Sequence, residues 1–358
     1  APPAELQDAA TRRRVRCGGA ALAFLCAVAI AVPAALAAPA TVRLPGRPPG
    51  LAKASAGARI ARGASSTQPL LETPRRNAVA VAAALAALAL PLRGRQPGGG
   101  AAWAETRQGG EVMVRGVGGD EVRLPGARAD SAVAKVLQSI SFAPKWPYTA
   151  LDFGRLDRQD DAAFYAEPKF VKHVDDAALA ALTAYYAAVF PRDRPFAALD
   201  LCSSWVSHYP ATPRPSRMAI VGMNEAELQR NEQATEHCVR DLNSDPQLPF
   251  RDGEFDIVTN TVSVDYLTRP REVFAEVSRV LRSGGLATVA FSDRVFLTKV
   301  VAIWSTLDDE GRAELVANYF HYAGGFRDVS VADISPSGGG FWSGEKRDPM
   351  FVVSAVKA

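Results

Sequence analysis

Residues 248–256 are Leu-Pro-Phe-Arg-Asp-Gly-Glu-Phe-Asp, and residues 276–286 are Glu-Val-Ser-Arg-Val-Leu-Arg-Ser-Gly-Gly-Leu. The second stretch lies in an amphipathic pattern over residues 271–282, whose apolar positions share one helical face: Val273, Phe274, Val277, Val280 and Leu281. Pro270 fits the first turn of such a helix, and Gly284-Gly285 fits its end. The sequence therefore predicts a helix that stops at the glycine pair.

Apolar strands and helices alternate on both sides of this helix. Helices are expected at residues 174–190, where Asp175 or Asp176 is a natural N-cap, and at residues 225–230. Buried strands are expected at residues 196–201, 218–221, 237–239, 255–259 and 286–291, and a closing pair at residues 329–334 and 350–356. This alternation predicts an α/β fold with a mostly parallel sheet, an antiparallel C-terminal hairpin and helices on both faces.

The two quoted stretches together resemble the second half of the type 11 domain of class I S-adenosylmethionine-dependent methyltransferases. The matching segments cover roughly residues 196–293. Residues 200–208 (Asp-Leu-Cys-Ser-Ser-Trp-Val-Ser-His) and 319–326 (Tyr-Phe-His-Tyr-Ala-Gly-Gly-Phe) are also similar to a plastid subgroup of plants and algae. The resemblance implies a Rossmann-like class I methyltransferase sheet and S-adenosylmethionine as the cofactor.

The resemblance also implies a cofactor site in the loops that follow the first four strands, where ligands of such sheets bind. Asp200 would organise the first loop, and Asn224 would replace the acid that bonds the ribose. The other implied positions are Cys202, Ser203 and Ser204 in place of glycines, Asp241 and Leu242 at the adenine, and Asn260 and Thr261 nearest the sulfonium. Side chains make positive φ angles costly in the first loop, and Asn224 lacks the charge that strengthens a hydrogen bond, so we expect reduced cofactor affinity.

Whether a general base is needed depends on the methyl acceptor, because methyl transfer itself requires mainly that the reactants be aligned and desolvated. The acceptor is expected to be a small or lipid-like molecule, and the candidate bases are His173, His208, Asp265, Tyr266 and His321. Each has a structural alternative; His208, for example, would cap a helix after the first loop. Residues 319–322 either wall an aromatic acceptor site or end an ordinary helix.

Two other functions remain open from the residues alone. The degenerate loop at Cys202–Ser204 suits a catalytically inactive binding or assembly protein of the same fold. A nicotinamide oxidoreductase is disfavoured, because no G-x-G-x-x-G follows the first strand. No metal site is expected, because no C-x-x-C spacing occurs.

The charge is divided unevenly along the 358 residues. Residues 1–104 carry a net charge of +10, so the remainder carries −7 of the total of +3, which argues against a nucleic-acid partner. Residues 1–104 predict a targeting leader: a signal-like start, a transit-like Arg- and Ser-rich stretch, and Arg75-Arg76 before an apolar run, as in a thylakoid signal. We therefore expect a plastid protein, delivered to the stroma or the thylakoid lumen. The mature protein is expected to keep no stable membrane span, with a retained anchor as the alternative.

The folded part is expected to begin after this leader. Residues 105–145 predict a linker or a small N-terminal extension, and a strand pair within them is left open. Residues 146–358 predict the methyltransferase-like domain with an N-terminal helical lid.

Overall fold

The computed structural model describes residues 13–14, 112–337 and 347–358. The chain divides into two compact units, and every described residue belongs to the unit of residues 1–17 and 77–358. Apart from Arg13 and Arg14, the predicted targeting leader lies outside the described residues. None of the helices in the described ranges is long and apolar enough to cross a membrane.

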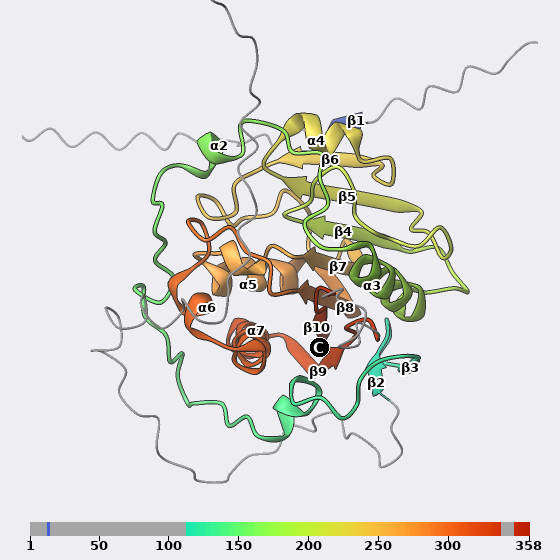
Figure 1. Cartoon of the computed structure of the whole chain (residues 1–358). Helices are drawn as coiled ribbons and strands as arrows, with labels where there is room; N and C mark the ends of the chain where they lie inside the picture. Colours follow the sequence, from blue (N-terminus) through green and yellow to red (C-terminus); the bar gives the residue numbers. More distant parts are fainter. Residues whose placement is uncertain (1–12, 15–111, 338–346) are drawn as a thin grey trace, which may run out of the picture. The chain divides into compact units, whose positions relative to one another are not determined.

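An eight-stranded mixed sheet organises the described part of the chain (Figure 1). Its strand order is β1-β6-β5-β4-β7-β8-β10-β9. β10 runs antiparallel to β8 and β9, whereas the other pairs are parallel. The bounds are β1 (Arg13–Arg14), β4 (Ala197–Leu201), β5 (Arg217–Gly222), β6 (Glu236–Val239), β7 (Phe255–Thr261), β8 (Leu281–Phe291), β9 (Phe326–Asp333) and β10 (Phe351–Lys357). The predicted Rossmann-like sheet and its antiparallel C-terminal pair are confirmed.

Strand order reverses between β4 and β7, because the chain moves from β4 to β5 and β6 on one side and from β7 to β8 on the other. The loops after β4 and β7 therefore diverge at the carboxyl edge of the sheet. Such a divergence leaves a crevice in open α/β sheets, and ligands bind there. The fold thus places the predicted site at this edge.

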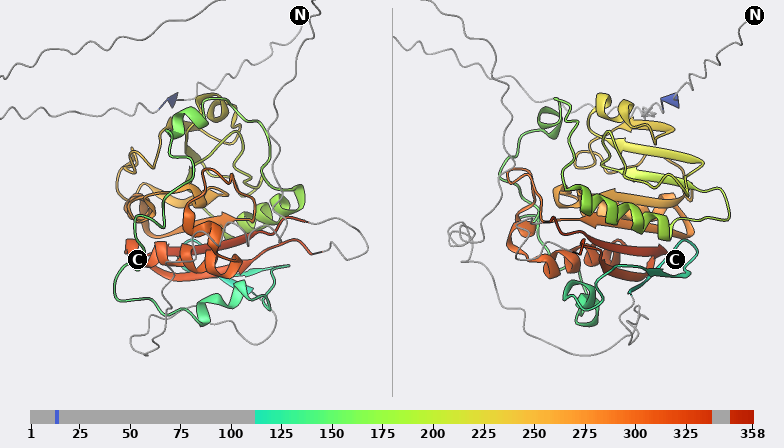
Figure 2. Two further views of the ribbon diagram at one scale, coloured as in Figure 1. Left: turned by 60° about the vertical axis from the view of Figure 1, so that its left-hand side comes forward. Right: turned by 45° about the vertical axis from the view of Figure 1, so that its right-hand side comes forward.

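Helices cover both faces of the sheet (Figures 1 and 2). Side chains of α3 (Asp176–Val189) and α4 (Glu225–Arg230) pack in one apolar core, and those of α5 (Pro270–Val280), α6 (Ala302–Thr306) and α7 (Asp309–Ala323) pack in the other. Successive strand residues alternate between the two cores: Leu199 and Leu201 face α5, and Ala198 faces α3. The predicted N-cap of α3 is confirmed, because the Asp175 side chain accepts from Ala178 N.

Asp256 explains why the Phe-Asp pair of the first quoted stretch decides the fold. Its buried carboxylate accepts a hydrogen bond from Ala197 N (2.8 Å) at the start of β4. It also pairs with Arg194 (3.0 Å) and Arg282 (2.9 Å). One carboxylate therefore aligns the amino ends of β4, β7 and β8.

The predicted end of helix 271–282 at the glycine pair is wrong. The helix α5 ends at Val280, and Leu281 is already extended and paired with Phe255 of β7. Sheet pairing therefore outweighs the glycine signal. Gly284 adopts a φ of +76° inside β8, where its carbonyl accepts from Gly118 N (2.8 Å).

The helix that His208 was predicted to cap is absent. Residues 202–216, which connect β4 to β5, form no helix. Pro210, Pro213 and Pro215 account for this, because each lacks the N–H of a helical hydrogen bond and restricts the residue before it. The crossover is therefore an irregular loop held by side-chain contacts.

The segment predicted as a linker or small extension contributes to the domain core. The strands β2 (Val112–Arg115) and β3 (Glu121–Leu124) form an antiparallel hairpin, which settles the open strand-pair alternative. Val112, Val114 and Leu124 are buried with the side chains of α3. The 3-10 helix η2 (Val133–Gln138) packs in the opposite core, with α5 and α7.

Candidate functional site

Asp200 is the penultimate residue of β4 and fixes the loop that follows. Its carboxylate accepts hydrogen bonds from Ser203 Oγ (2.6 Å) and Thr259 Oγ1 (2.7 Å). Burial raises the pKa of this carboxyl above its ordinary value, against the effect of these donors. Asp200 therefore organises the first loop through Ser203.

The loop at residues 202–204 bends sharply over β5. Cys202 has a φ of +54°, which costs a non-glycine residue about 1–2 kcal/mol. Ser203 N donates to Val221 O (2.8 Å), and the Ser203 carbonyl oxygen would lie 2.2 Å from a Cβ added to Gly222. The strain predicted for a positive φ angle in this loop is confirmed at Cys202. The backbone of the loop also approaches the backbone of β5 closely, at Gly222.

Asn224 holds the lid segment, which we define as residues 160–173. Its Oδ1 accepts from Glu227 N (3.1 Å), and its Nδ2 donates to Tyr165 O (2.8 Å) and Ala166 O (3.1 Å). The amide is therefore fully engaged by the protein itself. The assignment of Asn224 to the ribose stays a prediction, and it requires these contacts to open.

Glu227 is a site residue that sequence reasoning missed. Its carboxylate accepts from Lys169 N (2.6 Å) of the lid segment and from Ser204 Oγ (2.5 Å) of the first loop. A signal was present, because Asn224 and Glu227 have the spacing of a capping box. In the structure Glu227 instead joins the lid segment to the first loop.

The loop after β6 is held by local hydrogen bonds. Asp241 accepts from Asn243 N (2.9 Å) and Ser244 Oγ (2.5 Å), while Leu242 is buried in the core. Asn243 Nδ2 donates to Asp161 (3.0 Å) in the lid segment and to Tyr266 O (3.0 Å). Asp241 therefore sits at the carboxyl edge, and its contact with adenine stays a prediction.

A buried ion cluster anchors the start of the lid segment. Lys299 is 1% exposed and pairs with Asp157 (3.1 Å) and Asp161 (3.0 Å). Arg155 reaches the other oxygen of Asp161 (2.7 Å). Sequence reasoning missed this cluster, because Lys299 lies far along the chain from Asp157 and Asp161 and the three residues follow no motif.

Two polar atoms beyond the end of β4 lack hydrogen-bond partners among the described residues. They are Asn260 Oδ1 on β7 and Asp265 Oδ2 on the 3-10 helix η3 (Val264–Tyr266). Burial raises the pKa of the neighbouring Cys202 thiol to about 12, and Asp200 adds to the effect. A buried group left unpaired costs about 1–3 kcal/mol, and a polar ligand at the edge between β4 and β7 would offset that cost.

Adjacent residues of β7 face opposite sides of the sheet, which separates two predicted cofactor contacts. Asn260 lies toward Cys202, whose thiol it can hydrogen-bond. Thr261 Oγ1 is paired with the Tyr186 hydroxyl of α3 (2.8 Å). Asn260 is therefore available to a ligand, whereas the Thr261 hydroxyl is engaged.

The candidate bases are not gathered in one place. Asp265 and Tyr266 lie at the carboxyl edge, and a hydrogen bond from Tyr266 favours the charged form of Asp265. His173 packs on Phe296 (ring centroids 5.5 Å), at the end of the lid segment. Burial lowers the pKa of His208 to about 4, and its electrostatic neighbours are Lys172 and His173.

His321 stacks on Phe142 (4.1 Å) near the end of α7. Because α7 leads into the start of β9, this histidine lies at the edge opposite the site. Tyr319 and Phe320 are buried, and Tyr322 donates to Ala143 O (2.6 Å). Residues 319–322 therefore end an ordinary helix, as the second reading of this stretch predicted.

Comparison with known proteins gives a family match over part of the chain. Residues 212–289 match a family described as the methyltransferase domain. No curated protein matches the sequence. Within the described residues, no group of three His, Cys, Asp or Glu side chains is arranged to hold a metal ion.

Several solved structures are similar to this chain. An S-adenosylmethionine-dependent methyltransferase from Thermotoga maritima is 16% identical, with 51% of this chain and 91% of that chain covered and a TM-score of 0.37. One from Mesorhizobium loti is 14% identical, with 51% and 99% covered and a TM-score of 0.35. Phosphoethanolamine N-methyltransferase 2 from Haemonchus contortus, solved with S-adenosylhomocysteine, is 13% identical, with 50% and 52% covered and a TM-score of 0.34.

The strand order and the family match are independent observations that agree. The sheet has six strands paired in parallel, which diverge between β4 and β7, and an antiparallel β10 inserted between β8 and β9. The matched residues 212–289 run from before β5 into β8 and include both quoted stretches. The residues that match the methyltransferase domain therefore include the strands β5, β6 and β7 and the first residues of β8.

Proposed function

We propose that this protein is an S-adenosylmethionine-dependent methyltransferase that acts on a small molecule. The observation that carries the proposal is the buried Asn260 Oδ1 at the switch point between β4 and β7, which has no hydrogen-bond partner in the described part of the chain. When bound, S-adenosylmethionine supplies an electrophilic methyl group on a sulfonium. The chain's own residues then position and desolvate the reactants.

Residues from four loops would hold the cofactor. Asn260 and Cys202 would border its sulfonium, and Asp241 would accept from the adenine amine. Asn224 would turn to the ribose after the lid segment releases it. Asp200 contributes indirectly, because it holds Ser203 and hence the turn of the first loop.

The direct test is calorimetric titration of the full chain with S-adenosylmethionine and S-adenosylhomocysteine. We expect both to bind, and we expect Asn260→Ala to weaken binding about tenfold, because a buried hydrogen bond contributes roughly 1.5 kcal/mol. Asn318→Ala is the matched control, since that buried amide bonds only Glu314 O of its own helix. Failure of both ligands to bind the wild-type chain would refute the proposal and favour a non-catalytic binding protein.

The contacts of Asn224 predict a gain of affinity on substitution. Asn224→Asp keeps the acceptor for Glu227 N but loses the donors to Tyr165 O and Ala166 O, so the lid segment should loosen. The new carboxylate is also free for charge-assisted bonds to ribose hydroxyls. We expect several-fold tighter binding of S-adenosylhomocysteine and faster trypsin cleavage after Lys169 and Lys172.

Gln229→Glu is the control for this prediction, because it adds the same charge on an exposed position of α4. It should change neither cleavage nor affinity. Unchanged trypsin cleavage in Asn224→Asp would show that Asn224 does not hold the lid segment closed.

We further propose that the protein works in a plastid, either in the stroma or in the thylakoid lumen. The support is the basic, acid-poor composition of residues 1–104 and the Arg75-Arg76 pair before an apolar run. Import of the full chain into isolated plastids, followed by fractionation, tests this proposal. Recovery of the unprocessed chain outside the organelle would contradict it.

A further inference from the structure

Three aromatic rings surround the ammonium group of Lys169 in the lid segment. The Lys169 Nζ atom lies 4.2 Å from the ring centroid of Phe164, 5.8 Å from that of Tyr165 and 5.4 Å from that of Phe296. All three distances fall within the range of about 6 Å over which a ring face attracts a cation. We call Phe164, Tyr165 and Phe296 the ring cage.

The rings are oriented so that one cation can contact several of them. The Phe164 ring lies at 81° to the Tyr165 ring (centroids 5.0 Å apart) and at 73° to the Phe296 ring (5.5 Å). Rings at such angles can present their faces to one common point, and the Lys169 Nζ atom marks that point. Phe164, Phe296 and Lys169 are partly exposed, so the ammonium group can also leave the rings for water.

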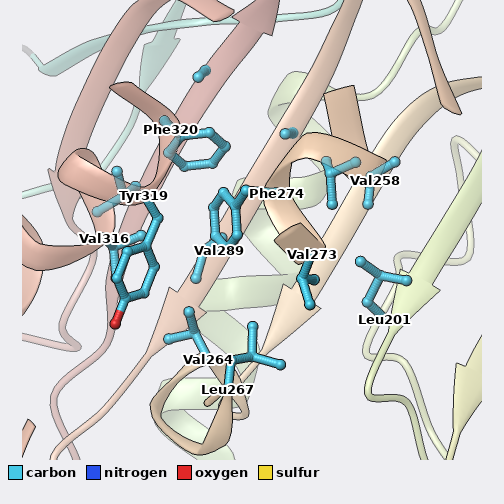
Figure 3. Close-up of a cluster of buried hydrophobic side chains, with 14 of the residues drawn as sticks. Leu201, Val258, Val264, Leu267, Val273, Phe274, Val289, Val316, Tyr319 and Phe320 are labelled. Atoms are coloured by element: carbon cyan, nitrogen blue, oxygen red, sulfur yellow. The ribbon is translucent and has the colours of Figure 1, made fainter. Parts of the chain in front are cut away.

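The ring cage differs from the aromatic clusters of the core. Phe274, Tyr319 and Phe320 are buried among apolar side chains of α5, α7 and the sheet, as Figure 3 shows. Packing of apolar surface accounts for those rings. The ring cage lies instead at the surface of the lid segment, where its rings contact a charge.

Lys169 contacts ring faces where another lysine contacts carboxylates. The Lys299 Nζ atom, which lies 5.3 Å from the Phe164 centroid, is paired with Asp157 and Asp161. The Lys169 Nζ atom forms neither a hydrogen bond nor an ion pair with any described residue. The rings therefore hold the Lys169 ammonium without help from an acceptor or a counter-charge.

Hydrogen bonds fix the ring cage against the loops after β5 and β7. Phe296 N donates to the Tyr266 hydroxyl (2.8 Å), and the main chain of the lid segment bonds Asn224 and Glu227. His173 packs on Phe296 (5.5 Å), and burial lowers the pKa of this histidine, so it brings no competing positive charge at neutral pH. The rings are thus held in place whether or not Lys169 occupies them.

We propose that the ring cage binds the alkylated ammonium group of a small molecule, and that Lys169 fills the site as an internal competitor. A quaternary ammonium carries its charge on methyl groups and has no N–H that needs an acceptor, which is why aromatic surfaces recognise it. Ring faces without an acceptor suit such a group better than they suit the primary ammonium of Lys169. The inference is independent of the proposed function, because it concerns the charge of a ligand and no reaction.

The experiment titrates the full chain with two probes of one shape. Choline carries a trimethylammonium group, and 3,3-dimethyl-1-butanol has a carbon atom in place of that nitrogen and hence no charge. Binding is measured by calorimetry at constant ionic strength. We expect choline to bind about tenfold more tightly than its neutral analogue, because more than one ring face attracts the charge.

Lys169→Met should tighten the binding of choline roughly fivefold. The substitution removes the competing ammonium, so the free site is populated more fully, while Lys169 N keeps its bond to Glu227 through the main chain. Lys172→Met is the matched control, because Lys172 lies on the same segment but pairs with Asp176 (2.7 Å). It should leave the affinity for choline unchanged.

Substitution of the rings should have the opposite effect. Phe164→Leu and Phe296→Leu should each weaken choline binding roughly fivefold, since leucine fills the volume but offers no ring face. Phe170→Leu is the control, because this exposed ring contacts Arg230 (5.1 Å). A ring variant that failed to fold would also lose binding, so the gain expected in Lys169→Met carries the test.

Acetylation of lysine side chains, followed by mass spectrometry, reports on the position of the ammonium group. Choline should raise the rate of acetylation at Lys169 several-fold, because the displaced ammonium enters water. The rate at Lys172, whose side chain is 48% exposed, should not change. An unchanged rate at Lys169 in the presence of bound choline would place the choline elsewhere and refute the site.

The remaining outcomes also decide the proposal. Equal affinities for choline and its neutral analogue, or no binding of choline by either the wild type or Lys169→Met, would refute recognition of a cation. Unchanged affinity in Lys169→Met would refute internal competition. Exclusion of choline by S-adenosylmethionine but not by S-adenosylhomocysteine would assign the ring cage to a sulfonium and overturn a separate ligand. Absence of cofactor binding would refute the proposed function and leave this inference standing.

Discussion

Replacement of Gly222 by alanine is expected to destabilise the protein by roughly 3 kcal/mol, because the added methyl group has no space. Its Cβ would lie 2.2 Å from the Ser203 carbonyl oxygen and 2.9 Å from Leu228 Cδ2. The Ser203 oxygen cannot retreat easily, since Ser203 N is bonded to Val221 O and its hydroxyl to Asp200. Urea unfolding of the full chain measures the loss.

Gly311→Ala separates this steric effect from the general effect of removing a glycine. A Cβ at Gly311 meets mainly the flexible Leu307 side chain, and the position lies within α7, where alanine is favoured by about 1 kcal/mol. We expect its free energy of unfolding to change by no more than that amount. Equal losses in both variants would mean that the loop at Ser203 does not press on β5.

The second large effect concerns Asp265 and the pH dependence of stability. Burial raises the pKa of this carboxyl from 3.8 in the unfolded chain to about 7 in the folded protein. Between these values the folded state holds a proton that the unfolded state has lost, so stability falls as pH rises, by about 1.4 kcal/mol per pH unit. Below pH 4 and above pH 7 this contribution is constant.

Asp265→Asn removes that penalty, because its side chain stays neutral. The variant should gain stability relative to the wild type as pH rises from 4 to 7, by up to about 4 kcal/mol, although its unpaired amide offsets part of this gain. Thermal unfolding of both chains at pH 4, 6 and 8 measures the difference. Parallel stability curves for the two chains would contradict the assignment of a protonated, buried Asp265.

A carboxylate oxygen without a hydrogen-bond partner among the described residues, such as Asp265 Oδ2, is costly to bury. The exposed Asp252 offers the comparison, since Asp252→Asn should alter the free energy of unfolding by no more than about 0.5 kcal/mol.

The sheet could be predicted from sequence because its signals are local. Buried strands such as β4 and β7 are short apolar runs, and Asp175 caps α3 within one turn. The end of α5 could not be predicted, because pairing of Leu281 with Phe255 depends on a partner 26 residues away. A local glycine signal was outweighed there by a distant contact.

The position of the candidate site could be predicted from the sequence, but the hydrogen bonds that its side chains make could not. The loops after β4, β5, β6 and β7 were correctly placed at one edge by the rule for parallel sheets. Asn224 bonds Tyr165 O, which lies 59 residues away along the chain, and Thr261 bonds Tyr186, which lies 75 residues away. Contacts over such distances leave no local signal in the sequence. Asp265 appeared only as one of five candidate bases, since the sequence does not reveal which carboxyl the fold buries.

The lid segment is fastened at both ends. Asp161 is bound to Lys299 and Arg155 at its start, and just beyond its end Asp175 exchanges hydrogen bonds with Asp348, which Arg294 also contacts. Between these two anchored ends, the lid segment contacts Asn224 and Glu227 through main-chain atoms only. Opening and closing of such a short segment, tethered at both ends, would take microseconds to milliseconds.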